Sequence, residues 1–230
     1  MSGVFITFEG GDGTGKSTQA RRLASLFTSA GRATWLTREP GGTPLADAMR
    51  ELLLHPDGSL AALGLASTEP ADKPFEEMLP ITEALLLSAA RAQHVARIRA
   101  WLNAGDAVIS DRYADATLAY QGYGRGYDLG ALRTLERMAT GGLRPSLTLL
   151  LDLPVEEGQR RKRAAHADGE DLNRLDTETA AFHQRVREGY LALALEEPQR
   201  WRVLDASLAP DALAERVRAA VAPLLHQPDA

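Results

Sequence analysis

One short segment near the N-terminus constrains the fold more than any other part of the chain. Residues 4 to 9, VFITFE, are β-branched and aromatic, which is typical of a buried strand. They lead directly into GGDGTGKST, residues 10 to 18, and a helical pattern then runs from about Ser17 to Ala30, with Gly31 as its stop signal. The order strand, glycine-rich loop and helix predicts the first βα unit of an α/β fold.

The loop matches the pattern G-x-x-x-x-G-K-[ST] between a strand and a helix. Its glycines let backbone N–H groups and the helix N-terminus face a phosphate, while Lys16 adds positive charge and the Ser17 hydroxyl can ligate Mg²⁺. The alternative is a glycine-rich turn that happens to precede a lysine. We expect an ATP site formed by Gly10, Gly11, Asp12, Gly13, Thr14, Gly15, Lys16, Ser17 and Thr18.

Asp12 places a carboxylate in a loop that should attract anions. Two like charges ~4 Å apart repel by about 4 kcal/mol at an effective dielectric near 20. Because the loop binds phosphate through its backbone, the Asp12 side chain is free to point elsewhere. Two interpretations stay open: Asp12 serves the turn geometry of an Asp-Gly pair, or it faces a second substrate.

Four further apolar runs, at 33–37, 107–111, 146–152 and 201–205, are each followed by a longer helical pattern. The longest predicted helix covers about 75 to 103, and others begin near Asp128, Val155, Thr177 and Asp211. The fold class is therefore α/β: a single domain over residues 1 to 230 with one five-stranded, mostly parallel sheet flanked by helices. Residues 55 to 74 are interpreted as a surface insertion.

Composition narrows the function classes. With 26 Lys and Arg against 31 Asp and Glu, the net charge of −5 offers no general attraction to nucleic acid or to an anionic membrane. The absence of cysteine excludes thiolate catalysis and Cys-ligated zinc. No signal peptide or membrane-spanning stretch is evident, so we expect a cytoplasmic protein.

Charged residues follow two of the predicted strands at the edge where an α/β sheet binds ligands. Arg38 begins the turn REPGG, and its planar guanidinium group can donate two hydrogen bonds to a phosphate. Asp111 ends the next strand, where it could hold Mg²⁺, and Arg112 supplies a second guanidinium group. Each arginine could instead be a solvated strand-end charge, but together with Lys16 they predict a phosphate site.

A second group follows in ADATLAYQG. Thr117, Tyr120 and Gln121 have the spacing of one side of a helical turn, and Gln121 can both donate to and accept from a pyrimidine edge. A polar helix surface would give the same spacing. Arg91, on the long predicted helix, either extends from a core face or presents its guanidinium to a cleft.

Residues 156 to 176 combine a basic run, Arg160 to Arg163, with a polar loop containing Gly169. A solvated helix would explain the run, but the pattern favours a flexible basic lid whose arginines cover the phosphoryl group and exclude water. Arg174 is a further candidate. The five histidines show no ligand spacing, and we assign them no chemistry.

Taken together, FEGGDGTGKST, TREPGGT, AARAQH, SDRYADATLAYQG and the lid resemble bacterial thymidylate kinase, of the P-loop nucleoside monophosphate kinase family, from about Val4 to near the C-terminus. The resemblance implies a five-stranded parallel sheet, a homodimer, and Mg²⁺-dependent transfer of the ATP γ-phosphoryl group to dTMP. Both substrates are small molecules.

The resemblance also implies roles for individual residues. Lys16, Asp12 and the lid residues Arg161 and Arg163 would be catalytic, and Ser17 and Asp111 would hold the metal. Leu87 stands where an aromatic residue usually stacks on thymine, so apolar contact would replace stacking. The implied dTMP site contains Asp12, near the 3′-hydroxyl, Arg38 and Arg112 for the phosphate, Arg91 and Gln121 for the base, and Leu87, Thr117 and Tyr120.

Two other functions stay open. A deoxynucleoside kinase would phosphorylate a sugar hydroxyl and would need a general base there, with little use for Arg38 and Arg112 together. A nucleotide-dependent switch would hydrolyse its nucleotide slowly, but the guanine-reading N-K-x-D motif that such switches usually carry is absent.

Overall fold

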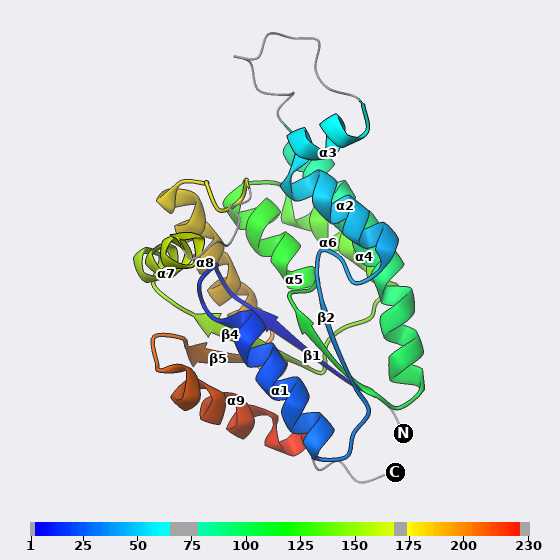
Figure 1. Ribbon diagram of the computed structural model, residues 1–230, viewed down its shortest axis with the longest axis vertical. Coiled ribbons are helices and arrows are strands. Elements are labelled where there is room, and N and C mark those ends of the chain that lie inside the picture. Colours follow the sequence, from blue (N-terminus) through cyan, green and yellow to red (C-terminus); the bar gives the residue numbers. More distant parts are fainter. Residues whose placement is uncertain (1–2, 65–77, 168–173, 226–230) are drawn as a thin grey trace.

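The structure, a computed structural model, describes residues 3–64, 78–167 and 174–225. Its centre is a sheet of five parallel strands in the order β2-β3-β1-β4-β5 (Figure 1). This confirms the predicted five-stranded parallel α/β fold. The strands are β1 (Val4–Glu9), β2 (Thr34–Arg38), β3 (Ala107–Asp111), β4 (Leu147–Asp152) and β5 (Trp201–Asp205).

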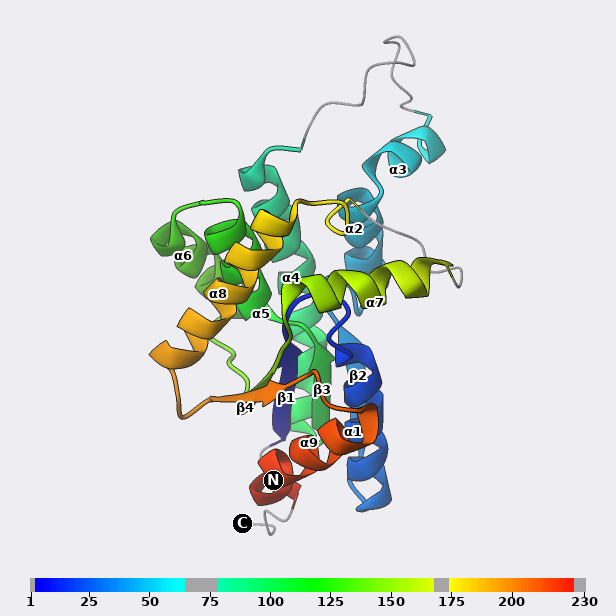
Figure 2. The ribbon, with the colours of Figure 1, turned by 90° about the vertical axis from the view of Figure 1, so that its left-hand side faces the viewer.

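Helices flank the sheet on both sides (Figures 1 and 2). They are α1 (Lys16–Ser29), α2 (Pro44–Leu54), α3 (Pro56–Ala62), α4 (Pro80–Asn103), α5 (Ala114–Thr117), the π-helix η1 (Leu118–Gly124), α6 (Leu129–Thr140), α7 (Val155–Ala167), α8 (Ala180–Glu196) and α9 (Pro210–Leu225). Among the described residues, no helix is both long and apolar enough to cross a membrane.

The central strand β1 divides the core by alternation. Ile6 and Phe8 pack with α1 and α9, whereas Phe5, between them in the strand, packs with α4. Side chains of successive strand residues point to opposite faces, so an uninterrupted apolar strand supplies two cores. A third cluster joins α8 to Leu150 of β4 and to η1. The sheet is thus buried on both faces, and its carboxyl edge is left for ligands.

Local signals set where several helices begin. The Thr43 hydroxyl accepts from the Ala46 N–H before Pro44 opens α2, and the Asp128 carboxylate caps α6 in the same way. α8 begins at Ala180 behind a Thr179 cap, three residues later than we predicted. Capping residues therefore account for starts that periodicity alone places only approximately.

One predicted helix start needs correction, and two helices were not predicted. The helix predicted from about 75 begins at Pro80, where proline is accepted in the first turn; residues 75–77 lie outside the described part. The proposed insertion at 55–74 contains a short helix, α3, with no buried residue, and positions 65–74 lie outside the description. α2 was not predicted at all.

Candidate functional site

The phosphate loop has the backbone that an anion site requires. Gly10 and Gly13 both have positive φ, and a Cβ atom at Gly13 would lie 2.3 Å from the Gly158 carbonyl oxygen, so no side chain fits there. Gly15, with φ of 87°, leads into α1, and no side chain caps that helix. Its first N–H groups are therefore available to a phosphate.

Lys16 is buried over this loop. Its Nζ donates to the Gly11 carbonyl oxygen at 2.6 Å, which holds the ammonium group beside the helix N-terminus. Burial, reinforced by the nearby Arg112 guanidinium, lowers the pKa of Lys16 to about 8. A bound polyphosphate would favour the charged ammonium form, so the site gains charge complementarity when an anion arrives.

Ser17 and Asp111 meet at the start of α1. The Ser17 hydroxyl donates to the Asp111 carboxylate at the end of β3, so the two predicted metal ligands are neighbours. Hydroxyl and carboxylate oxygens are hard donors of the kind that Mg²⁺ prefers. Across the described ranges, no three His, Asp or Glu side chains form a separate metal-binding cluster.

Arg112 links the loop to the rest of the site. Its φ of 70° is the one left-handed value recorded for a non-glycine residue in the described chain, and it turns the guanidinium back over β1. Nη1 donates to the Gly10 carbonyl oxygen at 2.9 Å and to the Tyr190 hydroxyl at 3.1 Å. Nη2 donates to the Asp12 carboxylate at 2.6 Å and to the Tyr120 hydroxyl at 3.0 Å.

Asp12 is thus paired rather than isolated. The Tyr120 hydroxyl also donates to its second carboxylate oxygen, at 3.1 Å. Burial opposes ionisation of Asp12, but the charges of Arg112 and Lys16 outweigh it and hold the pKa of Asp12 at about 2. The carboxylate is ionised at neutral pH and is available to accept a hydrogen bond.

Beneath this pair lies Glu9, which is fully buried at the end of β1. It accepts from the Tyr113 backbone N–H at 2.7 Å and from the Tyr190 hydroxyl at 2.8 Å. Burial, with the nearby Asp115 carboxylate, raises its pKa to about 8 although Arg112 opposes the rise. Glu9 is therefore a protonated acid at neutral pH, a feature that the strand sequence did not indicate.

A cleft of about 560 Å³ joins the phosphate loop to the second group of predicted residues. Its walls come from the loop and the start of α1, the ends of β2 and β3, and helices α2, α4, α5, η1 and α7. Every residue of the predicted acceptor site lines this cleft: Asp12, Arg38, Leu87, Arg91, Arg112, Thr117, Tyr120 and Gln121. The sequence thus predicted which residues the fold brings together.

Arg91 is held rigidly in this cleft. Its Nε donates to Glu39 at 2.7 Å, Nη1 donates to Thr117 at 3.1 Å and to Glu136, and Nη2 donates to the Tyr113 carbonyl oxygen at 3.3 Å. A guanidinium has five N–H donors, and the described residues engage four of them, so one Nη2 hydrogen is left for a ligand. Arg91 therefore presents a single donor at a fixed place, and it does not extend to the surface.

Gln121 is similarly oriented by a buried acid. Its amide nitrogen donates to Glu83, which Arg174 also contacts, while its amide oxygen is buried with no hydrogen-bond partner among the described residues. A buried unpaired acceptor is costly unless a ligand donates to it. In this structure Arg174 therefore reaches Gln121 only indirectly, through the Glu83 carboxylate to which both side chains donate.

Helix η1 explains how Tyr120 and Gln121 both reach the cleft. We predicted an ordinary helical turn, but the residues from Leu118 onwards form a wider π-helix, and both side chains are buried on the cleft side. π-Helical turns are rare and recur at functional sites. Leu87 lies across the cleft on α4 and supplies an apolar surface.

The lid residues separate into two groups. Arg161 lines the cleft, where its Nε donates to Glu157 at 2.7 Å and its Nη1 to the Ala206 carbonyl oxygen at 3.0 Å. Arg163, which we placed beside it, instead lines a different cavity behind the loop. Arg160 is exposed and pairs with Glu157. The structure continues α7 to Ala167, so part of the predicted polar loop is helical, and residues 168–173 lie outside its description.

The sequence did not indicate the acids and the histidine that fix the positions of the cleft side chains through hydrogen bonds. Glu39 accepts from Arg91 and lies 3.0 Å from His94 Nδ1, and His94 Nε2 lies 2.7 Å from the Thr37 hydroxyl. The spacing of the histidines along the chain did not indicate this role. The glutamate in EPGG, at a cis-proline turn, was the available signal for this network.

The comparisons with known proteins agree with this arrangement. A family model described as thymidylate kinase matches residues 8–67 and 71–217. Curated thymidylate kinases from Thermomicrobium roseum and Roseiflexus castenholzii are 50% and 46% identical, covering 97% and 96% of this chain and 96% and 94% of their own lengths.

A crystal structure of thymidylate kinase from Ehrlichia chaffeensis has a TM-score of 0.68 to this chain at 28% identity. The match covers 96% of this chain and 99% of that one. The fold, the family model and the relatives all lead to one assignment. The chain belongs to the thymidylate kinase family of enzymes.

Proposed function

We propose that this protein transfers the γ-phosphoryl group of ATP to dTMP, giving ADP and dTDP, a step in the supply of dTTP. One observation carries the proposal. A single cleft contains the phosphate-binding loop on one side. On the other side it contains the guanidinium groups of Arg38 and Arg112, beside a pocket the size of a base that is lined by Arg91 and Gln121.

The acceptor half fits a thymidine monophosphate. Arg38, whose side chain makes no hydrogen bond to the described residues, and Arg112 would bind the acceptor phosphate. The single free N–H of Arg91 suits one base carbonyl, and the unpaired oxygen of Gln121 suits the ring N–H of thymine. Leu87 would cover the ring face, and Asp12 would accept from the 3′-hydroxyl.

In the proposed reaction, an oxygen of the acceptor phosphate attacks the γ-phosphorus, the bond to the β,γ-bridging oxygen breaks, and ADP leaves with that electron pair. The attacking oxygen is already ionised near neutral pH, so no general base is needed and positioning carries the catalysis. Lys16 and Arg161 would balance charge that develops on the transferred group.

Ser17 and Asp111 fit Mg²⁺, which would neutralise phosphate charge and orient the β- and γ-oxygens when it is bound with ATP. Helix α7 lies across the carboxyl end of the sheet above α1 (Figure 2), a position suited to a lid that excludes water. We further propose a cytoplasmic homodimer, for which light scattering should give twice the monomer mass.

A coupled assay of ADP release tests the function, with ATP and, in turn, dTMP, thymidine or no acceptor. We expect rapid release with dTMP alone and its loss when Mg²⁺ is chelated. Release only with thymidine would establish a deoxynucleoside kinase instead, and slow release regardless of acceptor would establish a nucleotide switch. Lys16→Ala should lower turnover by about 10³-fold while the thermal unfolding curve is retained.

A further inference from the structure

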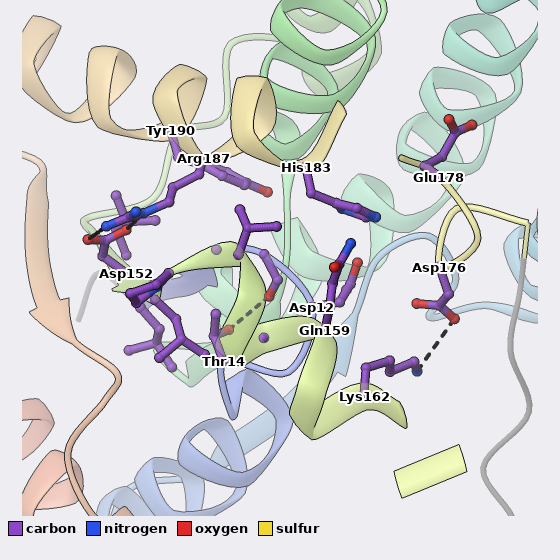
Figure 3. A pocket seen from close by; sticks show the side chains of 18 of the residues that line it. Asp12, Thr14, Asp152, Gln159, Lys162, Asp176, Glu178, His183, Arg187 and Tyr190 are labelled. Carbon is purple, nitrogen blue, oxygen red and sulfur yellow. Dashed lines mark hydrogen bonds and ion pairs between the residues drawn. The ribbon is translucent and has the colours of Figure 1, made fainter. Parts of the chain in front are cut away.

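A second cavity lies behind the phosphate loop, outside the cleft just described. It encloses about 280 Å³ between the end of β4, helix α7 and helix α8 (Figure 3). Arg38 does not line it, and neither does any residue of α2, α4 or η1. The cavity is therefore a distinct space on the far side of α7 from the acceptor pocket.

A tight backbone contact separates the two spaces. A Cβ atom added to Gly158 of α7 would lie 2.6 Å from the Asp12 carbonyl oxygen, so the helix rests directly on the loop. The cleft and the cavity share three lining residues, Asp12, Lys162 and Asp176. The last two form an ion pair at 3.5 Å. Anything bound in the cavity would touch both the loop and the lid helix.

The cavity walls are apolar where β4 ends, at Leu150, Leu151, Leu153, Pro154 and Val155. Most charged groups there are already paired: Arg187 donates to both Asp152 oxygens at 2.7 and 2.9 Å, and Asp12 and Glu178 pair with arginines outside the cavity. Arg163 lines the cavity from an exposed position. A bound anion would have to compete with the pair of Arg187 and Asp152 and would approach Asp12 and Glu178. These walls therefore favour a neutral ligand with an apolar body.

One buried polar atom among the side chains that line the cavity has no hydrogen-bond partner in the described part of the chain. The Nε2 atom of His183 is buried and makes no hydrogen bond to any described residue. Figure 3 shows its side chain on α8 and that of Gln159 on α7 extending toward one another. A neutral imidazole nitrogen is either a donor or an acceptor, depending on the tautomer, and a hydroxyl group can satisfy either one.

We propose that this cavity binds a neutral, two-ring aromatic molecule bearing one hydroxyl group, and that its occupancy alters the affinity of the neighbouring cleft for the acceptor nucleotide. An apolar cavity of about 150 Å³ holds one benzene, so a space of this size suits two fused rings. Because Nε2 is covered in this structure, the imidazole turns toward the ligand as the hydroxyl bonds to it, while the rings lie against the β4 residues. The coupling rests on the proposed function, but binding itself does not.

The two-ring probe 2-naphthol, with naphthalene as the matched probe lacking the hydroxyl, tests the site. Binding is followed by ¹⁵N–¹H NMR of the full chain without nucleotides. We expect 2-naphthol to shift amides of α7, α8 and the end of β4. His183→Phe keeps ring volume but removes the nitrogen, so it should weaken 2-naphthol binding about fivefold to tenfold and leave naphthalene binding unchanged.

Gln159→Trp fills the cavity from the partly exposed α7 side and should abolish binding of both probes, with folding checked by the same spectra. Three results would overturn the site. They are the absence of any shift up to the solubility limit of 2-naphthol, equal binding to the wild type and both variants, and shifts confined to the cleft. The coupling is measured separately. The Kd of dTMP should change when 2-naphthol is saturating, and the Kd of 2-naphthol should change by the same factor when dTMP is saturating. An unchanged dTMP Kd would overturn the coupling even where the probe binds.

Discussion

Replacing Glu9 by glutamine should make the protein less sensitive to alkaline pH. Glu9 is fully buried, and its two oxygens accept from the Tyr113 N–H and the Tyr190 hydroxyl. A glutamine has the same shape, keeps an oxygen for the backbone N–H, and can donate to the Tyr190 hydroxyl. The substitution therefore removes an ionisable group while it preserves packing and a hydrogen bond to each partner, the one to Tyr190 now running from the glutamine amide to the hydroxyl oxygen.

The magnitude follows from the pKa of Glu9, which burial raises from 4.5 to about 8. Below pH 4.5 the carboxyl is protonated in both the folded and the unfolded state and contributes no pH dependence. Between pH 4.5 and 8 the unfolded state loses its proton first, so the free energy of unfolding falls by about 1.4 kcal/mol per pH unit. Above pH 8 the loss reaches an upper limit of about 5 kcal/mol.

Urea unfolding of the wild type and of Glu9→Gln at pH 5, 7 and 9 measures this effect. The stability of the variant relative to the wild type should rise steadily with pH and level off above pH 8. Asp12→Asn is the control: the pKa of Asp12 is about 2, so its stability contribution is lost only below the usual value of 3.8, and its difference from the wild type should be constant over this range. A constant difference for Glu9→Gln as well would refute the claim that burial keeps Glu9 protonated.

Three further substitutions test the roles of individual cleft residues. Asp12→Ala should raise the KM for dTMP about 10-fold to 100-fold, because a hydrogen bond to a charged acceptor is lost, and should largely spare the KM for ATP; equal changes in steady-state kinetics would contradict this. Leu87→Phe should tighten dTMP binding by about 2-fold to 10-fold through an added aromatic face, and calorimetry showing no change would place the base elsewhere. Arg161→Ala should lower the single-turnover rate by about 10²-fold or more while Arg163→Ala changes it less than about threefold, since only Arg161 lines the cleft; the reverse order would reject this assignment.

The fold was predictable wherever the pattern was strong. The strand VFITFE and its counterpart at 107–111 were placed correctly because both are buried on two faces and read as continuous apolar runs. α2 was not predicted because the turn EPGGT, rich in proline and glycine, favours a loop at this point. Thr43 and Pro44 nevertheless form a standard helix start, and Pro44–Leu54 shows a clear apolar face.

The cleft residues were predictable for a different reason. Their chemistry is visible in the residue type at a strand end, and parallel strands bring those ends to one edge. The residues that orient them were not predictable, because Glu39, Glu83 and Glu136 look like ordinary surface acids until the fold buries them. Their partners are far away in sequence: Arg91 meets Glu39 across 52 positions and Glu136 across 45. Arg163 could not be placed for another reason. Its position in the helical repeat did not show which of the two cavities its side chain would line.

Asp12 shows how the fold resolves a conflict that the sequence only raises. Considered alone, its carboxylate would repel the donor phosphates, but Arg112, a hundred residues later, lies 2.6 Å from it and makes the pair neutral. The four Nη hydrogens of Arg112 are all engaged, with Gly10, Tyr190, Asp12 and Tyr120. An acceptor phosphate could take the Nε–H alone, but one that binds Arg112 through two N–H groups must displace at least one of these partners, and the Asp12 carboxylate is among them. Binding of the phosphate at one end of the nucleotide would release the group we propose for its sugar hydroxyl, so the two contacts should form together.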